Sequence, residues 1–355
     1  MMTPVRWIRG FLLTIGAVLI ICAVAVIVVD PFFHYHAPLS GLFYTLGTPR
    51  EQNDGITRHF DYDAVITGTS MAESFRVSEF DTLFETHAIK VCYPGATLKE
   101  TGDNLAVAFR TNPDIRMVLR SLDFSLLLTD PDALREDMGT YPVYLTNRNP
   151  FDDVQYWWNR DVLISYTLRS LIGGLRGTPG GVTSFDEYGF SDVLGDGLFQ
   201  GDRKSYGTAQ QERHLTEEER RLLQANLEQN VCAIARAHPE TRFVCFFPPY
   251  SMAYWGERRE EGTLAWTLEM EEAAIRQLIE VPNIELYSFQ TDISLTGDLT
   301  RYRDPGHYDY TVNSLILGRI YSEPDRWRLT QENLAAYLTE EAACHRDYDY
   351  NSLLK

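Results

Sequence analysis

The sequence predicts an α/β domain with a mainly parallel, five-stranded sheet, preceded by one N-terminal transmembrane helix. Two observations predict this. Residues 11–29 form an uncharged apolar run, and from residue 61 onward short β-branched runs alternate with helical periodicities. Strands that are separated by helices pair in parallel through crossover connections, with helices covering both faces of the sheet.

The apolar run, residues 11–29, reads FLLTIGAVLIICAVAVIVV. At the helical rise, nineteen residues span about 28 Å, close to the hydrocarbon thickness of a bilayer. Arg6 and Arg9 precede the run and Asp30 follows it. The positive-inside rule then places the N-terminus in the cytoplasm and the rest of the chain outside it, as in a single-pass protein of the cell membrane.

Three alternatives compete with an uncleaved anchor. A signal peptide would be cleaved at Ala23-Val24-Ala25, but the apolar run continues past that site without a break. A lipoprotein modified at Cys22 is disfavoured, because bulky Ile21 stands where a small residue is expected. A buried core helix is disfavoured, because the run is apolar on every face.

The composition excludes some classes of function. Lys and Arg number 32 and Asp and Glu 50, giving a net charge of -18, so nucleic acid is not an expected partner. The chain has no CxxC pair, which argues against zinc and thioredoxin-like sites; no metal or cofactor is expected. The spacing of Cys92, Cys232, Cys245 and Cys344 leaves open whether they form disulfides.

The chain divides into three expected parts: a cytoplasmic stub with the transmembrane helix (1–30), a membrane-proximal linker (31–60) and the α/β domain (61–355). Within the domain, residues 125–215 lose the alternation and hold an aromatic and a Gly-rich stretch. We expect an insertion there, of the kind that forms lids or mobile segments.

Five strands are expected in the domain, near residues 64–68, 88–93, 116–122, 242–247 and 284–289. Thr97 with Glu100, and Thr216 with Glu219, match the capping box and mark the starts of two helices. A last helix is expected near 329–342.

Two motifs carry candidate chemistry. Gly68-Thr69-Ser70 stands at the carboxyl end of the first strand, the edge where open α/β sheets bind ligands. Asp304-Pro305-Gly306-His307 precedes the last core helix, and its spacing can place the carboxylate beside an imidazole nitrogen. Taken singly, Ser70 can be a helix N-cap and the second motif a surface turn. Taken together, they supply a nucleophile, a base and an orienting acid.

In these two blocks the chain resembles the SGNH/GDSL hydrolase superfamily, over roughly residues 61–322 without the 125–215 segment. The resemblance implies a three-layer α/β/α, flavodoxin-like domain with Ser70, His307 and Asp304 as catalytic triad. It also implies an oxyanion hole of the Ser70 and Gly95 backbone N–H groups. The architecture resembles the membrane-anchored branch, which includes teichoic-acid D-alanylation and polysaccharide O-acetylation proteins.

One block departs from the family pattern. The third block usually supplies an Asn to the oxyanion hole, but the sequence there reads RSLDFS. An ionised Asp123 would repel an oxyanion, so we expect its carboxylate either to turn away from Ser70 or to be held by a cation such as Arg120. Tyr250 and Trp255, after the fourth strand, could border the substrate pocket or simply pack in the core.

Two functions therefore remain open at this stage. The first is a serine esterase or acyltransferase that acts on ester-linked acyl groups of a cell-surface polymer, a teichoic acid or a polysaccharide. The second is a catalytically silent module that binds such a polymer or scaffolds a membrane-bound O-acyltransferase. The intact Ser, His and Asp set favours the enzyme, and the missing Asn favours the silent module.

The anchor predicts a protease result. Protease added to intact cells should digest residues 31–355 and leave a small N-terminal fragment, because the uncleaved run 11–29 holds the domain outside. Immunoblotting with tags at each end measures this. Protection of the domain until lysis would reverse the topology, and a mature N-terminus near residue 26 would indicate cleavage.

Overall fold

The computed structural model describes residues 3–135, 141–147, 149–188, 203–207 and 211–354. The chain divides into two compact units. Unit 1 comprises Met1–Phe60 and Thr140–Ser184, and unit 2 comprises Asp61–Gly139 and Phe185–Lys355.

This division differs from the one expected from the sequence. Residues 31–60 are not a bare linker, because they fold together with 140–184 in unit 1. The expected insertion 125–215 is therefore split between the two units. Its parts at 136–140, 148, 189–202 and 208–210 lie outside the described residues.

Unit 1 is built from one long helix and several short elements. Its elements are α1 (Pro4–Val29), β1 (Phe43–Tyr44), α2 (Pro49–His59), α7 (Val143–Thr146), α8 (Val154–Trp157), the π-helical segment η1 (Val162–Leu168), α9 (Arg169–Leu175) and β5 (Gly181–Val182). β1 and β5 pair in parallel, with Phe43 opposite Gly181. η1 and α9 follow each other directly and form one continuous helical segment.

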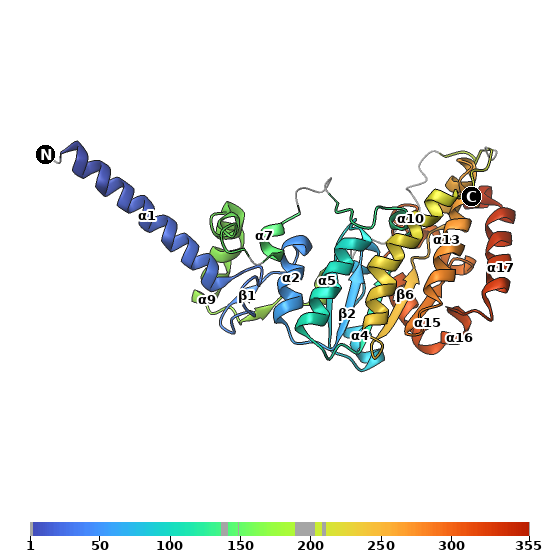
Figure 1. The fold of residues 1–355 in the computed structure, drawn as a ribbon, viewed down its shortest axis with the longest axis horizontal. Coiled ribbons are helices and arrows are strands. Elements are labelled where there is room, and N and C mark those ends of the chain that lie inside the picture. Colours follow the sequence, from blue (N-terminus) through green and yellow to red (C-terminus); the bar gives the residue numbers. More distant parts are fainter. Residues whose placement is uncertain (1–2, 136–140, 148, 189–202, 208–210, 355) are drawn as a thin grey trace. The chain divides into compact units, whose positions relative to one another are not determined.

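Helix α1, drawn in dark blue in Figure 1, contains the apolar run. Among the described residues it is the helix that is long and apolar enough to cross a membrane. Val26 and Val29, near its C-terminal end, are buried, whereas most of its earlier side chains are exposed. The last two turns of α1 therefore pack inside unit 1.

The helix ends at Asp30, which adopts the left-handed conformation and whose carboxylate is fully buried. One carboxylate oxygen accepts the His34 N–H at 3.0 Å and the Tyr156 hydroxyl at 2.9 Å. The other accepts the N–H groups of Tyr35 at 2.7 Å and His36 at 2.9 Å. Four donors thus satisfy a buried acceptor group and fold the chain back onto the end of the helix.

Unit 2 contains a six-stranded sheet in the order β3-β2-β4-β6-β7-β8. Its strands are β2 (Ala64–Gly68), β3 (Ala88–Cys92), β4 (Met117–Ser121), β6 (Arg242–Phe247), β7 (Ile284–Ser288) and β8 (Arg328–Leu329). The first five pair in parallel. They confirm the five expected strands, each boundary agreeing to within one residue.

The sixth strand was not expected. β8 pairs antiparallel with β7 through Leu286↔Leu329 and Tyr287↔Arg328. A two-residue strand is too short to show the period-2 alternation on which strand prediction depends. The last helix consequently begins later than expected, at Leu334 rather than near 329.

The helices of unit 2 connect and cover these strands. They are α3 (Ser70–Glu73), α4 (Val77–Phe84), α5 (Leu98–Thr111), α6 (Phe124–Leu127), η2 (Phe185–Glu187), α10 (Glu217–Leu227), η4 (Glu228–Cys232), α11 (Ala233–Ala237), α12 (Met252–Glu260), α13 (Leu264–Leu278), α14 (Ile293–Thr296), η5 (Leu299–Arg301), α15 (Tyr310–Ser322), α16 (Pro324–Trp327), α17 (Leu334–Asp347) and η6 (Tyr350–Leu354).

Two groups of packed helices stand out among them. α5, α10 and α13 pack together, and α4 packs against α15 (Figure 1). Both expected capping boxes are present, at the starts of α5 and α10. All five cysteines lie among the described residues and none of them forms a disulfide.

Candidate active site

The turn after β2 requires a glycine. Gly68 has φ +143°, and a Cβ atom there would lie 2.1 Å from Ser121 Oγ and 3.2 Å from the Ala72 Cβ. The chain therefore passes close to the end of β4 and turns at once into α3. Thr69 caps that short helix, its hydroxyl accepting the Met71 N–H at 3.2 Å, and Ser70 is its first residue.

Asp123 is bound to this turn. Its Oδ2 accepts the Thr69 hydroxyl at 2.9 Å and the Ser121 hydroxyl at 3.3 Å. Burial raises the pKa of Asp123 to about 6, although these two hydrogen bonds and the positive charge of His307 oppose the rise. The carboxylate thus braces the residue directly before Ser70.

Arg120 is not the partner of Asp123. Its guanidinium donates to the carbonyl groups of Asn230 at 2.7 Å and Leu98 at 3.1 Å, and to the Thr101 hydroxyl at 2.8 Å. Arg120 and Ser121 are adjacent in β4 and therefore point to opposite faces of the sheet. Ser121, and not Arg120, is on the side of Asp123. Hydroxyl groups therefore hold the Asp123 carboxylate, and Arg120, named as the partner in one of the two expected alternatives, does not.

Asp304 and His307 lie in a hairpin turn between η5 and α15. Tyr302 and Tyr308 form an antiparallel bridge that closes the turn. Asp304 Oδ1 accepts the N–H of Gly306 at 2.9 Å and of His307 at 2.7 Å. These two backbone bonds orient the carboxylate independently of its contact with the imidazole ring.

Two side chains connect this turn with the Ser70 helix. The Tyr308 hydroxyl donates to the Met71 carbonyl at 3.3 Å, and the Asn313 amide donates to the same carbonyl at 3.1 Å. Tyr308 is the residue after His307, and Met71 is the residue after Ser70. These bonds hold together two segments of the site that are more than 230 residues apart in sequence.

The result is a chain of three side chains. Ser70 Oγ lies 2.9 Å from His307 Nε2, and His307 Nδ1 lies 2.8 Å from Asp304 Oδ2. The imidazole and carboxylate side chains are 39% and 41% exposed, so a substrate can reach them. The structure thus brings together the three residues proposed from the sequence.

The charges of the pair stabilise each other. Burial alone raises the pKa of Asp304, but the hydrogen bonds from the His307 ring and backbone outweigh it and lower the value to about 2. The bond to Asp304 raises the pKa of His307, with burial opposing and the Asp304 and Asp123 charges adding to the rise. Asp304 is therefore ionised at neutral pH and favours the imidazolium form.

Gly95 lies at the same sheet edge as Ser70. Gly68 is paired with Cys92, and the Tyr93 N–H donates to the Gly68 carbonyl at 2.8 Å. Gly95 has φ +63°, and a Cβ atom there would lie 1.3 Å from Arg135 Nη1. That nitrogen donates to the Gly95 carbonyl at 2.6 Å. Arg135, a cation beside the expected oxyanion donor, was not identified from the sequence.

Tyr250 and Trp255 are both buried side chains. Tyr250 is 7% exposed, and its hydroxyl accepts the Phe124 N–H at 3.2 Å. Trp255 is fully buried and stacks on His345 with ring centroids 3.9 Å apart. Of the two readings that the sequence left open for this pair, the structure favours packing.

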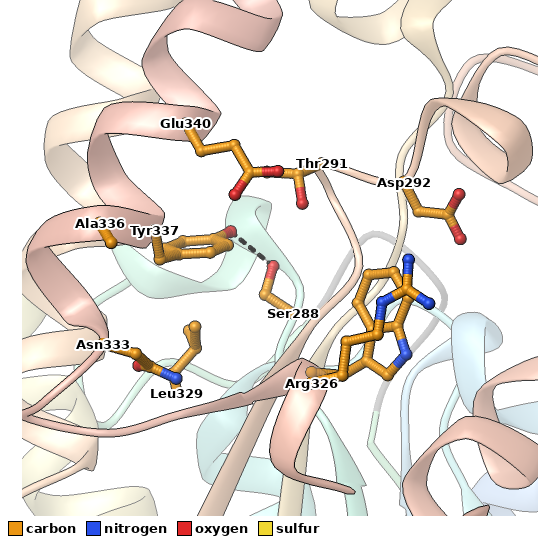
Figure 2. Close-up of a pocket in the computed structure, with 10 residues that line it drawn as sticks. Ser288, Thr291, Asp292, Arg326, Leu329, Asn333, Ala336, Tyr337 and Glu340 are labelled. Carbon is orange, nitrogen blue, oxygen red and sulfur yellow. Dashed lines mark hydrogen bonds between the residues drawn. The ribbon is translucent and has the colours of Figure 1, made fainter. Parts of the chain in front are cut away.

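A cavity of about 290 Å³ lies beyond the end of β7 (Figure 2). The ten described residues that line it do not include a member of the triad: Ser288, Thr291, Asp292, Arg326, Trp327, Leu329, Asn333, Ala336, Tyr337 and Glu340. In Figure 2 a dashed line joins the Ser288 and Tyr337 hydroxyls, which lie 2.7 Å apart. This cavity is separate from the three-residue site.

Comparison with protein-family models, with curated proteins and with solved structures gave no match for this chain. Within the described ranges, no group of three or more His, Cys, Asp or Glu side chains is arranged to hold a metal ion.

The glycine turn predicts a stability difference between two variants. Gly68→Ala should lower the free energy of unfolding by about 1–3 kcal/mol, because the new Cβ clashes with Ser121 and the φ angle suits only glycine. Gly318→Ala is the matched control. Its Cβ would meet nothing within 4 Å, and in a helix interior alanine should stabilise by up to about 1 kcal/mol.

Urea unfolding of both full-length variants in detergent measures these differences. Ser121→Ala should restore part of the stability lost in Gly68→Ala, because it removes the atom nearest to the new Cβ. Equal stabilities of the Gly68→Ala and Gly318→Ala proteins would contradict the close approach of β2 to β4 at this turn.

Proposed function

We propose that the protein is a membrane-anchored, extracytoplasmic serine esterase or acyltransferase that acts on ester-linked acyl groups of a cell-surface polymer. The observation that carries this proposal is the continuous chain of hydrogen bonds from Ser70 through His307 to Asp304. A nucleophile bonded to a base, with the base oriented by a third group, is the arrangement that activates a serine hydroxyl.

The SGNH-like assignment of unit 2 is part of the same proposal. Counted along the chain, the five parallel strands have the flavodoxin-like order 2-1-3-4-5, and the order reverses between β2 and β4. Ser70 follows β2 and Asp123 follows β4, so both stand at the reversal point, where such sheets bind ligands. The two groups of helices fit a three-layer arrangement.

The proposed reaction begins when Ser70 Oγ attacks the carbonyl carbon of the ester and His307 Nε2 takes the serine proton. The tetrahedral intermediate collapses, and the leaving alcohol receives that proton from His307. Water or a polymer hydroxyl then attacks the acyl-serine, with His307 again accepting and returning the proton. Attack by water gives an esterase, and attack by a polymer hydroxyl gives a transferase.

The oxyanion would be held by backbone N–H groups of Ser70 and Gly95. The N–H of the first residue of a helix has no partner in the preceding turn, and Ser70 occupies that position in α3. The cationic Arg135 beside Gly95 supplies favourable charge close to these donors. In this arrangement Asp123 positions Thr69 and is not itself an oxyanion donor.

The polymer and the partner follow from the resemblance to the membrane-anchored branch. Teichoic acid or an acetylated polysaccharide is the proposed substrate class, and a membrane-bound O-acyltransferase is the proposed neighbour that supplies or uses the acyl group. The apolar helix α1 supports a location at the membrane, and Arg6 and Arg9 support an outward-facing domain.

A catalytically silent module that binds the polymer is the second candidate. The observation that favours it is in the sequence RSLDFS, where Asp123 stands in the block that usually supplies an asparagine to the oxyanion hole. Loss of one oxyanion donor costs about 2.7–4 kcal/mol of transition-state stabilisation in a protease example. That loss lowers the rate but leaves the nucleophile reactive, so labelling separates the two candidates.

The triad predicts a labelling pattern. A fluorophosphonate should label the wild-type protein, and Ser70→Ala should abolish labelling because the attacking oxygen is gone. His307→Ala should suppress it strongly, because a neutral hydroxyl without its base is a weak nucleophile. Ser322→Ala, at an exposed serine in α15, is the control and should label normally. In-gel fluorescence measures each outcome.

The outcomes also separate the candidates. The silent module predicts no labelling in the wild type and a cellular phenotype that survives Ser70→Ala. Labelling that persists in Ser70→Ala would place the nucleophile at another serine. The Ser70→Ala/His307→Ala double variant should lose turnover about as severely as Ser70→Ala alone, because groups that act as a unit give non-additive losses.

The pKa of His307 predicts a pH profile. The protonated ring cannot accept the serine proton, and the pKa is raised above 6.5 mainly by the bond to Asp304. The kcat/KM for a small activated ester should therefore rise with pH through a midpoint above 6.5. Asp304→Asn should lower the rate and move the midpoint down. Asp123→Asn should move it down by less, since the Asp123 charge contributes less to the rise.

Stopped-flow or plate assays between pH 5 and 9 measure these profiles. A midpoint that stays in place in Asp304→Asn would show that another group controls the acid limb. An Asp123→Asn protein identical to the wild type in rate and midpoint would show that Asp123 is remote from the oxyanion and that its charge does not act on His307.

A further inference from the structure

The helical segment η1–α9 in unit 1 exposes several large apolar side chains and buries two polar ones. Four large apolar side chains, at spacings of four, four and three residues, are exposed on one face: Ile164, Leu168, Ile172 and Leu175. Leu175 is 88% exposed. We call these four residues the apolar stripe. Thr167 and Ser170, by contrast, are buried.

A helix that packs in water shows the opposite pattern, with its apolar stripe facing the core. Here the inward side is held by polar contacts as well as apolar ones. Ser170 Oγ donates to the Phe43 carbonyl at 2.8 Å, and Val162 packs with Val26 and Phe32 in a buried cluster. The apolar stripe is therefore exposed on the surface of unit 1. An exposed apolar surface of this kind is typically covered by another apolar surface.

The position of α1 identifies that surface. η1 packs against α1, and the Trp158 indole donates to the Leu19 carbonyl at 3.1 Å. Residues 22–29 of α1 are largely covered by unit 1, whereas 4–21 are almost entirely exposed. Eighteen helical residues span about 27 Å, close to the thickness of the hydrocarbon layer.

The bare part of α1 thus ends near Leu19, beside Trp158. Tryptophan is enriched at the membrane–water interface. The charges around the stripe also suit this level. Arg169 is exposed within the segment, and Arg160 and Arg176 are exposed at its two ends. Asp161 is the one acidic residue in 160–176, although the whole chain carries -18. Basic residues beside an apolar face are typical of helices that lie in a lipid interface.

We infer that η1–α9 is a second membrane contact: it lies in the interface of the leaflet from which α1 emerges, with the apolar stripe among the lipid chains. α1 then crosses the bilayer through residues 4–21 rather than 11–29, with the long side chains of Arg6 and Arg9 extending back to the cytoplasmic headgroups, and unit 1 rests on the surface. The inference uses the anchor of the proposed function but not the catalytic site.

Depth-dependent quenching tests this in proteoliposomes of the full-length protein. Single cysteines carry a bimane probe in a background where the half-buried Cys22 and Cys344 are replaced by alanine. The test site is Ile172→Cys. Leu13→Cys, in the middle of the bare part of α1 and 74% exposed, is the anchor control, and Leu315→Cys, an exposed apolar residue of α15, is the surface control. Lipids carry a nitroxide either near the headgroup or near the chain end.

The probe at Ile172 should be quenched several-fold more than the probe at Leu315, and more by the shallow nitroxide than by the deep one. The probe at Leu13 should respond most to the deep nitroxide. Quenching at Leu13 with none above the surface control at Ile172 would overturn the inference and leave the anchor intact. Absence of quenching at both Ile172 and Leu13 would contradict the membrane anchor itself.

Two further outcomes name other occupants of the stripe. Cross-linking of Ile172→Cys between two protein molecules, together with low quenching, would assign the stripe to a second copy and overturn the inference. Stronger quenching at Ile172 by the deep nitroxide would place the segment inside the bilayer rather than in its interface, and would also overturn it. Far-UV circular dichroism and urea unfolding of each variant, compared with the wild type, check that the protein remains folded.

Discussion

Strand β2 pairs with β3 on one side and with β4 on the other, and the candidate site depends on that central position. Parallel strands end at one edge of the sheet, so the residues that follow these three strands must meet there. Ser70, Gly95 and Asp123 are those residues. Gly68 allows the end of β2 to approach β4 closely, because a Cβ atom at this position would clash with Ser121.

The other half of the site depends on short-range bonds rather than on the sheet. Asp304 accepts two backbone N–H groups of its own turn and then the imidazole of His307. Backbone bonds pre-position the carboxylate, so little conformational entropy is lost when the imidazole aligns with it. Tyr308 and Asn313 then hold this preformed pair against the serine helix through one shared acceptor, the Met71 carbonyl.

The parts of this structure that sequence reasoning predicted are those with local causes. β-branched runs placed five strands, and two Thr-x-x-Glu boxes placed two helix starts. The triad was predicted because its residues lie in two short motifs at expected places in the chain order. Arg135 lies in a segment without regular periodicity, and its contact with Gly95 is long-range, so no pattern indicated it.

Unit 1 was missed for the same physical reason. Its strands have two residues each, and β1 pairs with a partner more than 130 residues away. Residues 31–60 and 140–184 therefore look like a linker and an insertion when each is considered alone. Only the contacts between them, such as Tyr156 with Asp30, produce a compact unit. Short elements joined by long-range contacts leave almost no periodic signal in a sequence.

The buried carboxylate of Asp30 has a mechanical consequence. Four hydrogen bonds join the end of α1 to the chain that follows it, so α1 and unit 1 move as one body. A tethered domain on a flexible stalk can let its helix slide or tilt freely when the bilayer changes thickness. If α1 spans a bilayer as proposed, a thinner or thicker bilayer must tilt the helix and the rest of unit 1 together. In that arrangement, membrane thickness sets the orientation of unit 1.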